Sequence, residues 1–184
     1  MPDYQPLSTY PFAMNSSLFI GGLYFTFNGS KLCFSTTIVL TFILQGVIML
    51  ILPLTANLGG AVAYWLCFLE LFIYGLLSGI CQSACYSYNA KLPARYIAVF
   101  LTSHGVAGIF SNVLRLVSLF IWPVATEAAT SAEEVDTTNA LKSCMFIQCS
   151  GVMVVLMCVP AQLYLNKNTF ANYYFYENTT ALHR

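Results

Sequence analysis

Apolar residues along this chain form five long runs that are separated by short polar stretches. Several runs exceed the ~18 residues that a helix needs to cross the hydrocarbon core of a bilayer. The runs are continuous, whereas the strands of a transmembrane β-barrel alternate between apolar and polar residues. The pattern predicts an all-α integral membrane protein with about five transmembrane helices. We expect these spans at about residues 7–27, 34–53, 61–89, 96–122 and 141–165.

The polar stretches between the runs define the expected turns and loops. A turn is expected near Lys31, and Pro53 is expected to end the second span. Residues 124–140 form an acidic extracytoplasmic loop, whose four carboxylates belong to a solvated surface in the simplest interpretation. Residues 166–184 resemble the start of a cytoplasmic loop. The whole chain is interpreted as one membrane domain.

The turn around Pro93 organises the predicted fold. Pro93 disfavours helix at the preceding residue and has no backbone N–H to donate, so residues 89–95 predict a tight turn between two membrane helices. Gln82 lies eleven residues before Pro93 and His104 lies eleven after it. At ~1.5 Å per residue both lie roughly 16 Å from the turn, near the middle of the bilayer. We therefore expect Gln82 and His104 to face each other or a common cavity.

Two charged residues also lie at nearly equal distances from Pro93, closer to the other membrane face. Glu70 lies 23 residues before Pro93 and Arg115 lies 22 after it, so the two are expected to pair as a gate. A purely structural ion pair is the alternative. Gln82 could likewise stabilise helix packing instead of binding a ligand.

Helical periodicity places these polar residues on one face of each helix. In the helix expected at residues 61–89 this polar face contains Glu70, Tyr74, Ser78, Gln82, Cys85 and Asn89. In the helix expected at residues 96–122 it contains His104, Gly108, Ser111, Arg115 and Ser118. Small residues on the second helix are expected to permit close helix packing: Gly105, Ala107, Gly108 and Ser111.

The same residues carry a resemblance to a known family. Gly79-x-x-Gln82, Leu92-Pro93-x-x-Tyr96 and Gly105-x-Ala107-Gly108-x-x-Ser111-x-x-x-Arg115 resemble the fourth and fifth membrane helices of the equilibrative nucleoside transporter family. The resemblance is strongest over residues 75–115. Extended along the chain, it aligns the five spans with membrane helices two to six of that family.

The resemblance implies a nucleoside or nucleobase transporter with part of the N-terminal half of a major-facilitator-like fold. It implies that Gln82 contacts the nucleobase and that Ser78 lines the same pocket. His104 departs from the glutamine common in the family, which leaves its contact to the substrate an open prediction. Because the later helices of the family have no counterpart here, we expect an incomplete chain. The alternative is a non-transporting membrane fragment or an assembly protein.

Composition narrows the functional classes. The chain is 58% hydrophobic, 8% charged and formally neutral, so nothing indicates binding to nucleic acid. Seven cysteines lie mostly in apolar runs without paired metal spacing, and neither a metal site, a disulfide framework nor a cofactor is expected. A membrane enzyme that uses His104 as acid or base finds little support, because no nucleophile accompanies it. We therefore expect no enzymatic activity.

The distribution of basic residues predicts the orientation. Lys31, Lys91, Arg95, Lys167 and Arg184 lie on one side of the five spans, which the positive-inside rule assigns to the cytosol. The N-terminus then lies outside. We expect a multi-pass protein of the plasma membrane, whose partners are the lipid bilayer, a nucleoside or nucleobase, and a second copy of the chain or a complementary half.

Overall fold

The computed structural model describes residues 6–29, 32–122 and 133–167. Within these ranges the chain forms five α-helices and no strand, which confirms the all-α prediction. The helices are α1 (Pro6–Asn28), α2 (Phe34–Ala56), α3 (Gly60–Asn89), α4 (Ala94–Ile121) and α5 (Glu133–Lys167).

Four of the five helices are long and apolar enough to cross a membrane. Their qualifying segments are Phe34–Ala56, Gly60–Asn89, Tyr96–Ile121 and Leu141–Leu165. Helix α1 is not among them, although it covers the first predicted span. Its apolar run is interrupted by Pro11 and by Asn15, Ser16 and Ser17. The structure therefore shows a multi-pass membrane protein with four clear spans, and a fifth span in α1 stays a prediction.

Two predicted boundaries are wrong in the structure. Helix α2 continues past Pro53 to Ala56, and the following turn uses Gly59 and Gly60, both with φ of 69°. That left-handed region favours glycine because a Cβ would clash there. Helix α5 begins at Glu133, so the last part of the predicted acidic loop is helical. Residues 123–132 and 168–184, which contain the rest of that loop and most of the predicted C-terminal loop, lie outside the described ranges.

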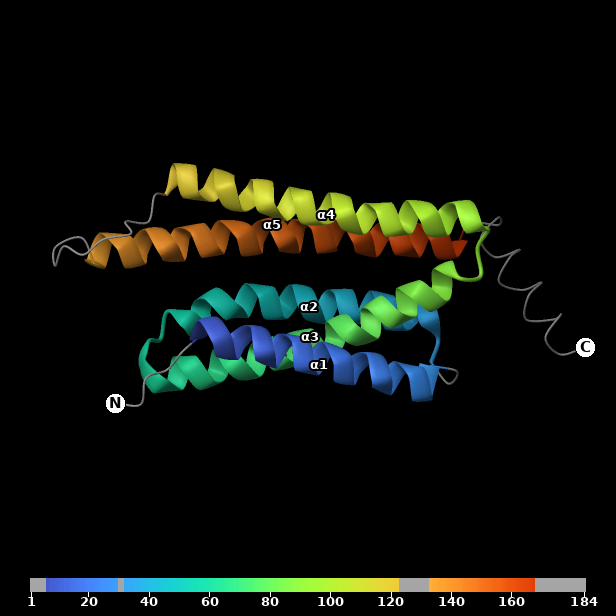
Figure 1. The fold of residues 1–184 in the computed structure, drawn as a ribbon, viewed down its shortest axis with the longest axis horizontal. Coiled ribbons are helices and arrows are strands. Elements are labelled where there is room, and N and C mark those ends of the chain that lie inside the picture. Colours follow the sequence, from blue (N-terminus) through green and yellow to red (C-terminus); the bar gives the residue numbers. More distant parts are fainter. Residues whose placement is uncertain (1–5, 30–31, 123–132, 168–184) are drawn as a thin grey trace, which may run out of the picture.

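The turn at Pro93 forms as predicted. Leu92 N–H donates to the Asn89 carbonyl over 2.9 Å, and Tyr96 N–H donates to the Pro93 carbonyl over 2.9 Å. Pro93 itself has φ of −54° and precedes the first residue of α4. The chain reverses here, so α3 and α4 run antiparallel (Figure 1).

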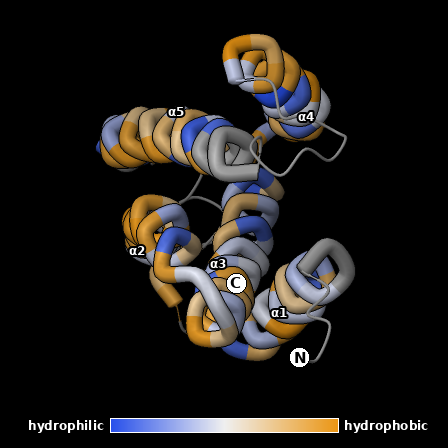
Figure 2. The backbone as a smooth tube through the Cα atoms, turned by 90° about the vertical axis from the view of Figure 1, so that its left-hand side faces the viewer, coloured by the Kyte–Doolittle hydropathy of each residue, from blue (hydrophilic) through white to orange (hydrophobic). Residues whose placement is uncertain are grey.

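The helices form two groups. Helix α3 packs against α1 and α2, while α5 packs against the other side of α2. Helix α4 lies beside α5 and touches α3 only weakly (Figures 1 and 2). We call α1, α2 and α3 the three-helix layer and α4 and α5 the two-helix layer. The predicted hairpin forms, but the expectation that α3 and α4 lie side by side along their length is wrong, because these two helices diverge after their turn (Figure 1).

The closest helix packing joins α1 to α3. A Cβ placed on Gly79 would clash with the carbonyl of Leu18, and one placed on Gly75 would clash with Met14 and Ser17. Gly75 and Gly79 form a Gly-x-x-x-Gly motif, which lets helix backbones approach in membranes. Gly21 makes the same kind of contact from α1, against the carbonyl of Leu76.

Helix α4, in contrast, is almost uncovered. Of its described side chains only Ser118 is buried, and a Cβ added to Gly105 or Gly108 would meet nothing within 4 Å. The prediction that these small residues permit close packing is wrong for the described part of the chain. Helix α4 is instead held near its ends. Ser143 donates to Ser118 over 2.9 Å, and the rings of Trp122 and Phe146 lie 5.7 Å apart.

A small buried core lies at the end of the molecule that contains the α3–α4 turn. It consists of Phe25, Ile38, Ala84 and Tyr88, from the three helices of the three-helix layer. The Lys91 ammonium lies 4.9 Å from the centre of the Phe34 ring beside this core, a cation–π contact. This core and the α1–α3 packing hold the three-helix layer together.

Candidate functional site

A cavity of about 570 Å³ lies between the two layers. All five helices contribute to its lining, and Met14, Met49 and Leu71 form part of its apolar wall on the three-helix layer. Ala107 and Phe110 line it from α4, and Val154 lines it from α5. This volume lies within the ~300–1,000 Å³ range of small-molecule sites. We call it the inter-layer cavity.

Polar side chains converge on this cavity from three apolar helices. They are Tyr74 from α3, Ser111, Asn112 and Arg115 from α4, and Gln148 and Ser150 from α5. Polar groups are rare in membrane spans and usually face a cavity or one another, because lipid cannot satisfy their hydrogen bonds. Their convergence makes this cavity the candidate functional site.

Several of these groups already use part of their hydrogen-bonding capacity. Asn112 Nδ2 donates to the Gly108 carbonyl over 3.0 Å, so Asn112 Oδ1 stays available as an acceptor. Ser150 donates to the Phe146 carbonyl over 2.8 Å. Each bond joins two residues of the same helix, α4 for Asn112 and α5 for Ser150, and holds the side chain on the cavity wall.

Among the described residues, Arg115 is the only charged one that lines the inter-layer cavity. Across the described ranges its guanidinium makes neither a hydrogen bond nor an ion pair, and the Arg115 side chain is exposed. A guanidinium carries five N–H donors and no acceptor, and it stays protonated in proteins. The cavity therefore presents an unused, positively charged set of donors.

The predicted ion pair between Glu70 and Arg115 is not formed. Glu70 accepts a hydrogen bond of 2.8 Å from the Thr55 hydroxyl instead. Thr55 lies near the end of α2, which packs directly on α3, whereas α4 has moved away from α3 at this level. Matched depth along two antiparallel helices is thus insufficient to bring their side chains together.

Gln82 and His104 do not share a cavity either. Gln82 is half-buried in a groove between α1 and α3, beside Leu18, Gly22 and Thr26. His104 is exposed on α4, and its Nδ1 lies 3.1 Å from the Phe100 carbonyl. The prediction that Gln82 and His104 face each other is wrong, because Gln82 lies on the side of α3 that packs on α1.

His104 belongs to an aromatic cluster that joins α3 to α4. Its ring stacks on Tyr86 with centroids 6.0 Å apart and meets the edge of Phe100 at 4.8 Å. Tyr86 and Phe100 also lie edge to face at 5.2 Å. This cluster is a contact between the two layers near the turn, and not a wall of the inter-layer cavity.

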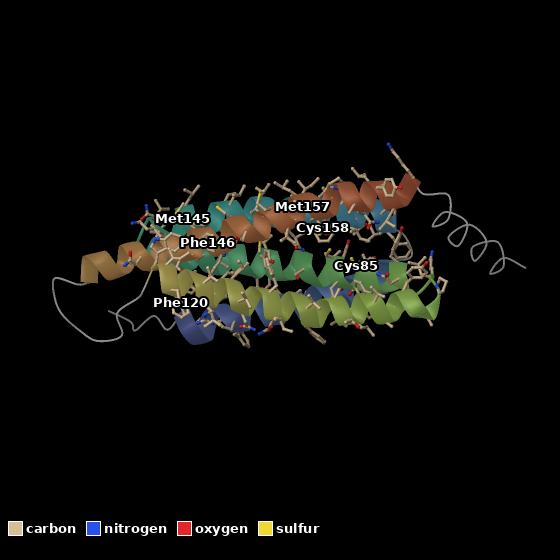
Figure 3. The ribbon with its side chains drawn as sticks, turned by 90° about the horizontal axis from the view of Figure 1, so that it is seen from above. Cys85, Phe120, Met145, Phe146, Met157 and Cys158 are labelled. Carbon is tan, nitrogen blue, oxygen red and sulfur yellow. The ribbon has the colours of Figure 1, made fainter. Side chains whose placement is uncertain are left out.

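Ser78 lies one turn after Tyr74 on α3 and is half-buried. Past Ser78 toward the turn, a second cavity of about 370 Å³ opens between the layers. Cys85 of α3 and Cys158 of α5 both line it (Figure 3). Phe42, Tyr96 and Phe100 make this second cavity aromatic.

Sequence reasoning therefore found part of the candidate site. Of the residues singled out on α4, Ala107, Ser111 and Arg115 line the inter-layer cavity, and Tyr74 of the α3 polar face joins them. Gln148 and Asn112 were missed. The available signal for Gln148 was a lone amide within the apolar run of residues 141–165.

The cavity offers hydrogen-bond donors, acceptors and aromatic faces. Among the residues that the structure describes, no group of three or more His, Cys, Asp or Glu side chains is arranged to hold a metal ion. All seven cysteines lie in described segments as free thiols. Such an arrangement is suited to holding a polar solute by several weak contacts.

Comparison with protein-family models, with curated proteins and with solved structures finds no match to this chain.

Proposed function

We propose that this chain is part of a membrane carrier that moves nucleosides or nucleobases by the equilibrative mechanism. The observation that carries the proposal is the inter-layer cavity, in which six polar side chains converge between membrane-spanning helices. Polar groups at such a place are functional candidates because leaving them in lipid is costly. The cavity volume suits a small organic solute.

The class of solute rests on the sequence resemblance. Three positions of the Gly105-to-Arg115 motif, namely Ala107, Ser111 and Arg115, line this cavity. The motif resembles a membrane helix of the equilibrative nucleoside transporters. Cavity and motif therefore support the same function from two independent directions.

The arrangement of the layers supports a carrier. Transporters commonly bind substrate between two helical bundles and expose the site by rocking one bundle against the other. Here the two-helix layer meets the three-helix layer mainly through α2 and α5, while α4 touches α3 only weakly. Gln82 keeps its predicted contact to the nucleobase only if α1 and α3 separate, so we assign the solute to the inter-layer cavity instead.

Filling the cavity tests this proposal. Ala107→Phe would place a ring in the inter-layer cavity, and Val106→Phe is its matched control because Val106 points toward a shallow outer groove of α4. Uptake of radiolabelled nucleosides and nucleobases is measured in transport-deficient cells that express a membrane-inserted form of the protein. We expect at least a tenfold loss of uptake in Ala107→Phe and near-normal uptake in Val106→Phe. Equal uptake by both variants, or none by the unmodified protein, would contradict the proposal.

One observation favours a second candidate function. The outer face of α4, with Val99 and Val106, is uncovered along most of the span. A membrane protein that assembles with another helix through this face, without transporting a solute, would present such a surface. Absence of uptake together with a detergent-stable oligomer that Val106→Phe disrupts would identify that role.

A further inference from the structure

The inter-layer cavity combines a guanidinium, neutral polar groups and two aromatic rings. Resting on the proposed function, we infer that the cavity selects 6-oxopurines, the bases of guanosine and inosine, over the 6-aminopurine of adenosine. Arg115 would read the O6 and N7 atoms of the base, while Tyr74 and Phe110 would contact its faces.

The guanidinium of Arg115 supplies the charged hydrogen-bond donors of the cavity. Arg115 lines the cavity with a guanidinium that has no hydrogen-bond or ion-pair partner among the described residues. Its planar N–H groups match two acceptors that lie side by side. In a 6-oxopurine O6 and N7 form such a pair, and arginine bonded to both is the commonest specific contact to guanine. Adenine offers N7 beside an amino group, so one N–H of the guanidinium would face another donor.

The hydrogen-bond acceptors that line the cavity are neutral among the described residues. In the described part of the chain no carboxylate lines the cavity, and Glu70, the nearest candidate by depth, accepts from Thr55 on α2. Within this described lining, an exocyclic amino group would find its acceptors in the neutral oxygens of Asn112, Gln148 and the hydroxyls. The cavity therefore favours a ligand edge that accepts hydrogen bonds over one that donates them.

The aromatic rings that line the cavity favour a flat ligand. Tyr74 stands on α3 and Phe110 on α4, so aromatic rings line the cavity from both layers. Aromatic faces bind planar bases by stacking, which is tolerant of base identity and leaves discrimination to the hydrogen bonds. A compact inorganic anion would interact with the charge of Arg115 but would not stack on the rings of Tyr74 and Phe110. The combination thus favours a flat base with an acceptor edge over a free anion.

Competition experiments with matched analogues test the inference. Uptake of radiolabelled inosine is competed with unlabelled inosine, 7-deazainosine, adenosine, adenosine monophosphate and inorganic phosphate. We expect inosine to compete about tenfold or more better than 7-deazainosine and adenosine, because each of these loses one half of the pair. Arg115→Gln should remove these differences, while Arg115→Lys, which keeps the charge but lacks the planar pair of donors, should retain only part of them.

The outcomes separate the inference from the proposed function. Equal competition by inosine and adenosine would overturn the inference and leave nucleoside transport standing. Stronger competition by the monophosphate or by phosphate would also overturn it and would assign an anion to Arg115. No uptake of any nucleoside would remove both. Thr102→Ala, on the exposed side of α4, is the control variant and should leave every ratio unchanged.

Discussion

Glu70 and Arg115, the two charged residues that depth along the helices suggested as a pair, have different surroundings in the structure. Glu70 is hydrogen-bonded across to Thr55, whereas Arg115 is left to a cavity. A carboxylate with a hydroxyl donor is satisfied locally and needs no function. A guanidinium in a cavity, without a partner among the described residues, is in contrast a candidate for binding a ligand.

Cys33 provides a prediction at the level of a single residue. It is exposed just before the first turn of α2, outside the membrane span, and Thr36 donates hydrogen bonds to its sulfur from both hydroxyl and backbone N–H. These bonds stabilise the thiolate and lower the pKa of Cys33 below its ordinary value. The thiolate fraction at neutral pH is therefore raised, and the rate of maleimide labelling should reach its plateau at lower pH than for an ordinary thiol.

Thr36→Val is the matched variant for this measurement. It removes the hydroxyl bond and keeps the backbone bond, so the midpoint of the rate–pH profile should move upward, toward the ordinary thiol value. The profile is recorded by mass spectrometry of the Cys33 peptide. An unchanged midpoint in Thr36→Val would show that the hydroxyl does not act on Cys33.

Glycine distribution decides which helices pack closely. Gly75 and Gly79 on α3 lie against the backbone of α1, but Gly105 and Gly108 on α4 face open space. Both pairs look alike as small residues in an apolar run. The Gly75–Gly79 pair has the four-residue spacing of the Gly-x-x-x-Gly motif, whereas Gly105 and Gly108 are three residues apart.

A pair of alanine substitutions compares these two helices. Gly79→Ala places a methyl group against the carbonyl of Leu18, while Gly108→Ala has room. The gain in helix propensity is the same for both and cancels in the comparison. We expect Gly79→Ala to be less stable than Gly108→Ala by about 1–3 kcal/mol, the usual cost of overpacking. The measurement is reversible unfolding in detergent micelles, and equal stabilities would mean that α1 does not pack on α3 as described.

At the scale of the whole molecule, the ends of the helices agree with one orientation. The end of α1, the start of α2, the α3–α4 turn and the end of α5 all lie at one end of the bundle (Figure 1). Lys91 and Lys167 lie at this end, which the positive-inside rule assigns to the cytosol. The inter-layer cavity lies toward the other end, because Arg115 is near the far end of α4.

Labelling with a membrane-impermeant maleimide tests this orientation. Leu58→Cys, in the exposed turn between α2 and α3, should react from outside intact cells. Cys33 should react only after the membrane is permeabilised. The reverse pattern would invert the orientation and place the inter-layer cavity on the cytosolic side.

The sequence by itself determined the helices and the turn. Long apolar runs must be helical in lipid because every backbone group needs an internal partner, and Pro93 marks a turn wherever it interrupts such a run. The bounds of α2, α3 and α4 follow from these local rules to within a few residues. Arg115 of α4 was also recognised locally, because charge in an apolar span is conspicuous.

Only the tertiary structure decided which helices are neighbours. Lipid tails are as apolar as leucine, so hydrophobicity does not choose the partner of a membrane helix. Close packing determines the partner instead. The glycines of α3 allow α3 to pack on α1, while α4 packs beside α5. That choice separated Gln82 from His104 and Glu70 from Arg115. It also gathered Tyr74, Arg115 and Gln148 around one cavity, which no pattern along the chain could specify.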